Sequence, residues 1–131
     1  MLIQRSLYDQ MIAHCQKGYP FEACGILVGK GGKIQKIYCT RNVDHSAVSY
    51  SIDSKELLQI SKELRIQRLE MLGIFHSHVA SEAYPSSVDK SLAFYPDATY
   101  VIISLANRTK PITKGYRIIE EKIIPEELEI V

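Results

Sequence analysis

The segment Gly73-Ile74-Phe75-His76-Ser77-His78 carries an apolar run directly into two histidines. A short apolar run of this kind predicts a buried strand, here spanning Leu72–His78. Side chains two residues apart on a strand point to the same face of a sheet. We therefore expect both imidazole rings side by side on one face, where they can reach one metal ion.

Apolar runs and turn residues on both sides of this segment predict further helices and strands in an irregular order. The expected helices are Ser6–Gly18, Asp53 to about Met71, and Ser86–Tyr95, the first two opened by capping-box spacings at Ser6 with Asp9 and Asp53 with Glu56. The expected strands are Cys24–Val28, Lys33–Thr40, Val48–Ile52, Leu72–His78, Thr99–Leu105 and, more weakly, Gly115–Ile119 and Glu121–Ile124. This order predicts the α+β class, or α/β with a mixed sheet: a central mixed β-sheet flanked by helices.

Length and composition exclude several kinds of protein. The chain has 131 residues, of which 46% are hydrophobic and 24% charged, so one domain over residues 1–131 is expected. A net charge of +1 disfavours a protein that coats nucleic acid. The longest run without charged side chains is the eleven residues of Met71–Ser81, whereas a membrane helix needs about 20 apolar residues. No signal peptide is visible, and three cysteines without a CxxC pair favour the reducing cytoplasm over a disulfide scaffold.

A candidate third metal ligand follows the two histidines. Asp89 comes eleven residues after His78, behind a loop and the first turn of a predicted helix. Two imidazoles and one carboxylate suit Zn²⁺ and leave one coordination position open for water. An alternative remains open, because Ser86 and Asp89 alone also have the spacing of a helix capping box. The two oxygens of one carboxylate allow it to serve both roles.

A catalytic zinc site also needs a base that takes a proton from water. Glu22 leads directly into the apolar strand Cys24–Val28, so it can approach the core from a sheet edge, or it is simply a solvated residue at a strand start. The other nearby acids have simpler explanations: Asp53 and Glu56 as helix caps, Glu63 and Glu70 on a solvated helix face, and Glu82 in a loop. His14 and His45 are expected at the surface or outside the ligand set, and Cys24 as a small buried hydrophobic residue.

The order His76-Ser77-His78, seven residues, Ser86, two residues, Asp89, with Glu22 upstream, resembles the JAMM (MPN-plus) zinc metallopeptidase family. The resemblance extends over nearly the whole chain and includes Pro20–Gly25, Gly73–Phe75 and Tyr100–Ser104. The length is similar to that of the compact stand-alone prokaryotic members.

The resemblance implies a role for each residue of this set. His76, His78 and Asp89 would bind one Zn²⁺ per chain. Glu22 would deprotonate the attacking water and pass the proton to the leaving amine, and Ser86 would donate a hydrogen bond to the oxyanion. An MPN/JAB fold, related in outline to the cytidine deaminase fold, is implied as well. Val79 stands where many members have proline, which leaves the course of the next loop open.

The resemblance further implies a hydrolase that cuts the amide bond after the C-terminal Gly-Gly of a small ubiquitin-like or sulfur-carrier protein. That bond would join the carrier to cysteine, to another amino acid or to a protein lysine. The alternative is a non-catalytic MPN-type interaction module, which the intact ligand set disfavours. A nucleobase deaminase is disfavoured because the chain lacks H-x-E and P-C-x-x-C.

Overall fold

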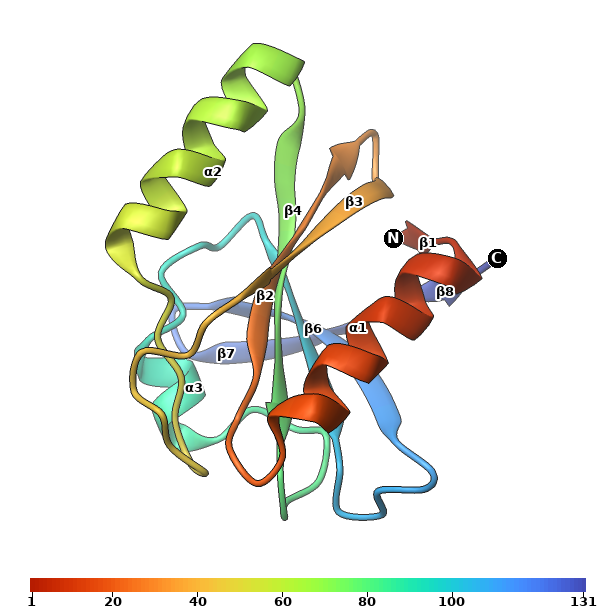
Figure 1. Cartoon of the computed structure of the whole chain (residues 1–131), viewed down its shortest axis with the longest axis vertical. Coiled ribbons are helices and arrows are strands. Elements are labelled where there is room, and N and C mark those ends of the chain that lie inside the picture. The colour runs from red at the N-terminus through yellow and green to blue at the C-terminus, as the bar shows by residue number, and fades with distance from the viewer.

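A curled, mixed β-sheet of eight strands forms the body of the molecule, and three helices lie against it (Figure 1). The computed structural model describes residues 1–131. The helices are α1 (Arg5–Gly18), α2 (Ser54–Gln67) and α3 (Ser87–Ser91). The strands are β1 (Leu2–Ile3), β2 (Cys24–Lys30), β3 (Lys33–Thr40), β4 (Glu70–His78), β5 (Thr99–Ser104), β6 (Ile112–Ile119), β7 (Lys122–Glu126) and β8 (Glu129–Ile130). The predicted α+β class with a mixed sheet is confirmed.

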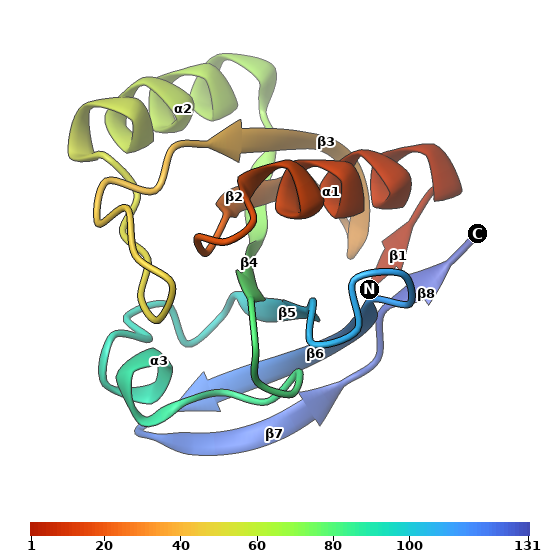
Figure 2. The same ribbon diagram turned by 60° about the horizontal axis from the view of Figure 1, so that its bottom comes forward.

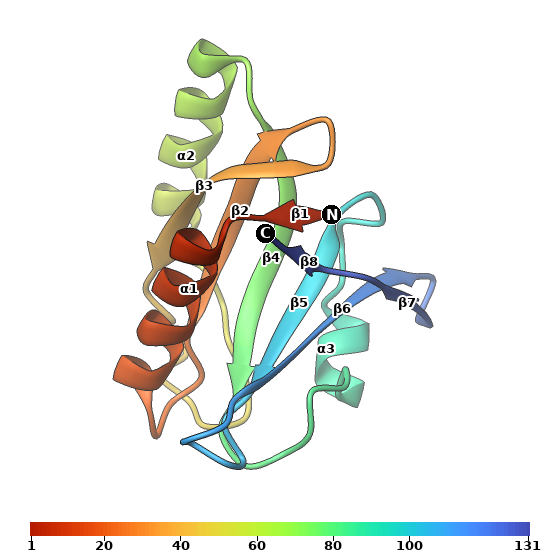
Figure 3. The same cartoon turned by 90° about the vertical axis from the view of Figure 1, so that its right-hand side faces the viewer.

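The strand that carries the two histidines lies near the centre of the sheet. The strand order is β7-β6-β5-β4-β2-β3-β1-β8, with β4 antiparallel to β2 and parallel to β5. A parallel pair needs a crossover connection, and the segment containing α3 provides it between β4 and β5. The sheet twists strongly along this order, as Figure 3 shows. Because β4 and β5 are parallel, the chain must run back from the end of β4, at His78, to the level of Gly73 before β5 begins.

Alternation along β4 assigns its side chains to two faces. Phe75 packs in one cluster with Met11 and Cys15 of α1. Ile74 packs in a second cluster with Ile102 of β5. His76 and His78 lie two and four residues after Ile74 on the strand, so they share its face, as the spacing predicted.

The two long helices cover different faces of the sheet. Helix α2 buries Ile60 and Leu64 against Ile26 and Val28 of β2, whereas α1 packs with Leu27 of the same strand. Figure 2 shows β2 and β3 passing between these helices. None of the three helices has the length and apolar composition that a bilayer crossing requires.

The start of α1 differs from the prediction. The helix begins at Arg5 with Gln4 at its N-cap, and no side chain caps it, so the capping box at Ser6 with Asp9 was wrong. The Arg5 N–H donates instead to the carbonyl of Val131 at 2.9 Å. Pairing of β1 with β8 brings that carbonyl to the helix, and it satisfies a donor that a cap would otherwise serve.

The region between α2 and β4 also differs. Asp53 holds the N-cap position but makes no side-chain cap bond, and Glu56 accepts from the backbone N–H of Arg41 instead. The helix ends at Gln67 rather than near Met71, because Arg68 adopts a left-handed conformation. The next residues pair with β2, so β4 begins two residues before the predicted strand.

Three further regions differ from the prediction. Val48–Ile52 is a loop with one isolated bridge between Asn42 and Ile52, so the predicted strand was wrong. Helix α3 is shorter than predicted and ends at Ser91. Strands β1 and β8 were not predicted. They are two residues long and pair with each other, which places the two ends of the chain side by side (Figure 1).

Candidate metal centre

Three potential ligand atoms converge at the carboxyl end of β4. The Nε2 atoms of His76 and His78 lie 3.2 Å apart, and Asp89 Oδ2 lies 3.2 Å from the first and 2.9 Å from the second. Ligand atoms on a tetrahedral zinc with bonds of about 2.0–2.1 Å are about 3.3 Å apart. All three residues are buried. The structure thus brings together the predicted set in an arrangement that fits a small cation.

The hydrogen-bond partner of His78 fixes which of its nitrogens faces the cluster with a lone pair. His78 Nδ1 lies 2.8 Å from the carbonyl oxygen of Glu82, which can only accept, so Nδ1 carries the proton. Nε2 of the neutral ring and Asp89 Oδ2 are then two acceptors in contact, and a proton or a metal cation must lie between them. Glu82 contributes its main-chain carbonyl, which orients the imidazole, and not the side chain that the sequence singles out.

Burial and mutual contact shift the pKa values of the three side chains. Burial lowers the pKa of His76, which keeps its ring neutral and able to coordinate. Burial also opposes the charged form of His78, but its bonds to Asp89 and to the Glu82 carbonyl outweigh that effect and raise its pKa. Burial opposes the charged form of Asp89 as well, yet hydrogen bonding with the two histidines holds its pKa far below the usual range.

The carboxylate of Asp89 serves two structural roles. Ser86 is the N-cap of α3, where its Oγ accepts from the Asp89 N–H at 3.1 Å while its own N–H donates to Asp89 Oδ2 at 2.9 Å. The predicted capping box is therefore confirmed. The Asp89 Oδ2 atom that accepts from Ser86 is also the oxygen that faces the histidines. Capping aims the carboxylate at the two histidines, so the confirmed cap leaves Asp89 available as a candidate metal ligand.

Glu22 lies two residues before β2 and is only 5% exposed, so the solvated alternative was wrong. Its backbone is held on both sides: its N–H donates to Ser46 at 2.8 Å, and its carbonyl accepts from Asn42 at 2.9 Å. Its Oε1 has no hydrogen-bond partner. Burial raises the pKa of Glu22 to about 8, with His78 opposing that rise. A carboxyl group in this range is suited to proton transfer near neutral pH.

Ser77, between the two histidines, ties the start of β2 to β4. Its side chain points to the opposite face, where Oγ accepts from the Ala23 N–H at 2.8 Å. Its N–H donates to the Ala23 carbonyl at 3.0 Å. Because Ala23 follows Glu22, these bonds fix the position of the glutamate next to the histidines. No local sequence signal indicates this role of Ser77, since its partner Ala23 lies 54 residues away along the chain.

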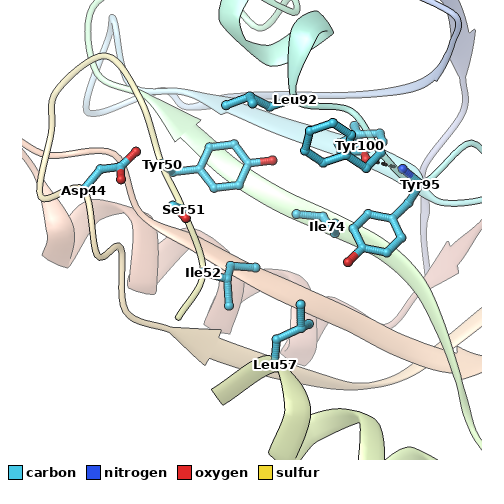
Figure 4. Close-up of a pocket in the computed structure, with 10 residues that line it drawn as sticks. Asp44, Tyr50, Ser51, Ile52, Leu57, Ile74, Leu92, Tyr95 and Tyr100 are labelled. Atoms are coloured by element: carbon cyan, nitrogen blue, oxygen red, sulfur yellow. Dashed lines mark hydrogen bonds between the residues drawn. The ribbon is translucent and has the colours of Figure 1, made fainter. Parts of the chain in front are cut away.

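Two hollows adjoin the cluster. The first, of about 300 Å³, has Glu22, Val48, His78 and Ser86 among its lining residues. The second, of about 360 Å³, is mainly apolar, and Tyr50, Ile74 and Tyr100 are among its lining residues (Figure 4). The predicted base Glu22, the predicted ligand His78 and the predicted oxyanion donor Ser86 therefore all line the first hollow.

The remaining candidates lie outside this cluster, as expected. His14 donates from its Nε2 to the Cys24 carbonyl of β2 at 3.0 Å, because a carbonyl oxygen can only accept. His45 is exposed and stacks on Phe21. Cys24 is fully buried, as predicted, and all three cysteines are free.

Comparison with known proteins identifies the family. The model that describes prokaryotic homologues of the JAB domain matches residues 4–117. The chain belongs to the prokaryotic JAB family.

Relatives of this JAB chain include proteins with described activities. It is 33% identical over 133 residues to the CysO-cysteine peptidase of Mycobacterium tuberculosis, covering 100% of this chain and 91% of that protein. It is 40% identical over 68 residues to the desampylase of Pyrococcus furiosus, covering 52% and 49%. A JAB1/MPN domain protein from Archaeoglobus fulgidus, whose crystal structure is known, superposes with a TM-score of 0.67 at 21% identity, covering 100% of this chain and 99% of that one. The MPN/JAB fold is thereby confirmed.

Hydrogen bonds to the main chain hold the loop that begins with Val79, after the second histidine of this JAB domain. The Ser81 carbonyl accepts from Ser104 Oγ at 2.6 Å, and the Ala83 carbonyl accepts from the Tyr116 hydroxyl at 2.6 Å. Together with the bond from His78 to Glu82, these contacts hold three successive carbonyls of the loop. They fix the path that Val79 left open.

Because the Glu22 carboxyl is buried, we expect Glu22→Gln to raise the free energy of unfolding of the metal-free JAB domain. Its pKa rises from 4.5 to about 8 on folding, so ionisation favours the unfolded chain increasingly as the pH rises between these values. Removing the ionisable group should raise the free energy of unfolding by about 3 kcal/mol at pH 7.

Urea unfolding of both proteins with a chelator present, at pH 4 and pH 7, measures this effect. At pH 4 the glutamate is mostly protonated in both states, so its ionisation contributes little and the two curves should nearly coincide. A gain of equal size at both pH values would contradict the explanation.

Proposed function

We propose that this chain is a zinc-dependent peptidase that hydrolyses the amide bond after the C-terminal Gly-Gly of a small ubiquitin-like or sulfur-carrier protein. The observation that carries the proposal is the contact of His76, His78 and Asp89 at 2.9–3.2 Å, beside a hollow that Glu22 and Ser86 also line. Two imidazoles and one carboxylate are a ligand set of catalytic zinc sites, which keep one position open. One Zn²⁺ per chain would fill this site.

The substrate class is supported by the relatives described above. The CysO-cysteine peptidase matches this chain over its whole length, and the desampylase matches over half of it. We assign the same reaction type here: hydrolysis of a conjugate that joins a carrier protein to cysteine, to another amino acid or to a protein lysine. A Gly-Gly tail has no side chains beyond Cα, so it can enter a narrow active site as extended chain. The free cysteines agree with a cytoplasmic location.

The chain supplies the proton transfers and the orientation of the reacting groups. A zinc ion at this site would make bound water acidic near neutral pH and would polarise the scissile carbonyl. Glu22, buried and unpartnered at Oε1, takes the proton from the attacking water and delivers it to the leaving amine. The second transfer matters because an amide nitrogen leaves easily only after protonation.

Ser86 stabilises the charge that develops on the carbonyl oxygen. Its Oγ already accepts from the Asp89 N–H, which leaves its own hydroxyl proton free to donate into the hollow. A donor held in place before the reaction costs no reorganisation when the oxyanion forms.

Ser86→Ala should therefore lower kcat about 10²–10³-fold while zinc content stays at the wild-type level. Loss of the N-cap should also cost about 1 kcal/mol of stability. Ser87→Ala, one residue further along at an exposed position, is the matched control and should retain wild-type kcat. Loss of zinc in Ser86→Ala would assign the residue to positioning Asp89 rather than to the oxyanion.

The proposed function is tested by elemental analysis of the purified chain and by incubation with a carrier protein extended beyond its Gly-Gly by one cysteine. We expect about one zinc per chain and release of cysteine, with mass spectrometry locating the cut after the second glycine. Stoichiometric binding of the conjugate without turnover by the zinc-loaded protein would instead favour the non-catalytic interaction module.

A further inference from the structure

The two histidines of the cluster are oriented by different means. The terminal torsion of a histidine side chain has only weak intrinsic preferences, so a metal-binding ring needs an external contact to hold its plane. His78 has one in the hydrogen bond from Nδ1 to the Glu82 carbonyl. His76 has no such bond, since its Nδ1 is buried without any partner. Another contact must hold the ring of His76.

Tyr50 provides that contact. Its ring stacks on the ring of His76, with centroids 4.4 Å apart and planes inclined by 23°. Rotation of the His76 ring about its terminal torsion would push the imidazole edge into this flat surface. On another side, the His78 ring meets His76 at 5.0 Å and 61°. The plane of His76 is therefore set by packing.

The position of Tyr50 is itself fixed by a side chain outside the cluster. Asn42 uses both ends of its amide on the neighbours of Tyr50: Nδ2 donates to the Ser49 carbonyl at 2.9 Å, and Oδ1 accepts from the Ser51 N–H at 3.0 Å. The same Nδ2 donates to the carbonyl of Glu22. One amide thus connects the backbone that carries the stacking ring with the backbone that carries the candidate base.

We propose that Tyr50 is a positioning residue that holds the His76 imidazole in the orientation required for metal binding. This inference rests on the proposed zinc site and adds a residue to it. The essential feature is the flat face of the ring. The phenol oxygen points across the apolar hollow in Figure 4 and is not needed for the role. Tyr50 touches the ligand, and it acts on the reaction only through that ligand.

Zinc affinity of the metal-free protein, measured by competition with a chromophoric chelator, tests the proposal without an activity assay. Tyr50→Phe keeps the flat face and should bind zinc within about threefold of wild type. Tyr50→Leu keeps an apolar side chain but loses the flat ring face, and its zinc affinity should fall about 10–100-fold, as for other contacts that orient metal ligands. Tyr95→Leu is the matched control, because Tyr95 lines the same hollow without a ring contact to either histidine, and it should bind as wild type.

The absorption spectrum of the Co²⁺-loaded proteins provides a second readout, since it reports the ligand geometry. We expect the Tyr50→Phe spectrum to match wild type and that of Tyr50→Leu to differ. If Tyr50→Leu does not fold, Tyr50→Met, which fills the space with a flexible chain, should show the same loss. Equal zinc affinity and equal spectra for wild type and Tyr50→Leu would overturn this inference alone. Failure of the wild-type protein to bind zinc would overturn the proposed function together with it.

Discussion

Glu22→Gln is expected to lower kcat for cleavage of a Gly-Gly conjugate about 10²–10⁴-fold, the range typical of a lost general acid–base group. Gln keeps the shape and the buried position but cannot accept a proton from water or deliver one to the amine. The carboxylate has no hydrogen-bond partner at Oε1, so the substitution breaks no structural bond there. The backbone bonds to Ser46 and Asn42 do not involve the side chain and should persist.

The zinc content of Glu22→Gln separates a lost base from a damaged site. Zinc should remain at the wild-type level, and the variant should retain uncleaved conjugate on a size-exclusion column. Glu70→Gln is the control, because this exposed glutamate lies at the far end of the same strand as the histidines. Wild-type turnover by Glu22→Gln would reject the assigned base, whereas loss of zinc would assign Glu22 to the ligand set.

Asp89→Asn should weaken zinc binding by at least about 100-fold and abolish hydrolysis with it. Substitutions of groups that merely orient metal ligands cost about 10–100-fold, and this change removes the charge of a ligand itself. The amide oxygen of Asn can still accept from the Ser86 N–H, so the cap of α3 should survive. The loss should therefore concern metal binding far more than folding.

Chelator competition measures the affinity, and thermal unfolding of the metal-free variant measures the fold. Asp97→Asn removes an exposed carboxylate further along the chain, beyond α3, and should leave zinc binding unchanged. Zinc bound as tightly by Asp89→Asn as by the wild type would show that the carboxylate is only a helix cap. Asp89→Ala, which removes cap and ligand together, should lose stability as well.

Local patterns predicted the parts of the site that depend on neighbouring residues. The side-by-side placement of His76 and His78 follows from the two-residue alternation of any strand, and the capping box of Ser86 with Asp89 follows from the geometry of a helix start. Local patterns failed where a backbone group forms its hydrogen bond with a residue far away along the chain. The start of α1 is capped by the carbonyl of Val131, which no local signal indicates.

The sequence by itself determined the chemistry of this protein: two imidazoles on one strand face, a carboxylate that a short helix start aims back toward them, and an acidic residue ahead of an apolar strand. Only the tertiary structure decided that Glu22 is buried and that Tyr50 lies on His76. Alternation and capping are fixed by dihedral angles within a few residues, so they can be predicted from a short stretch. Burial and stacking depend on which distant strands and loops meet, and that follows from the packing of the whole chain.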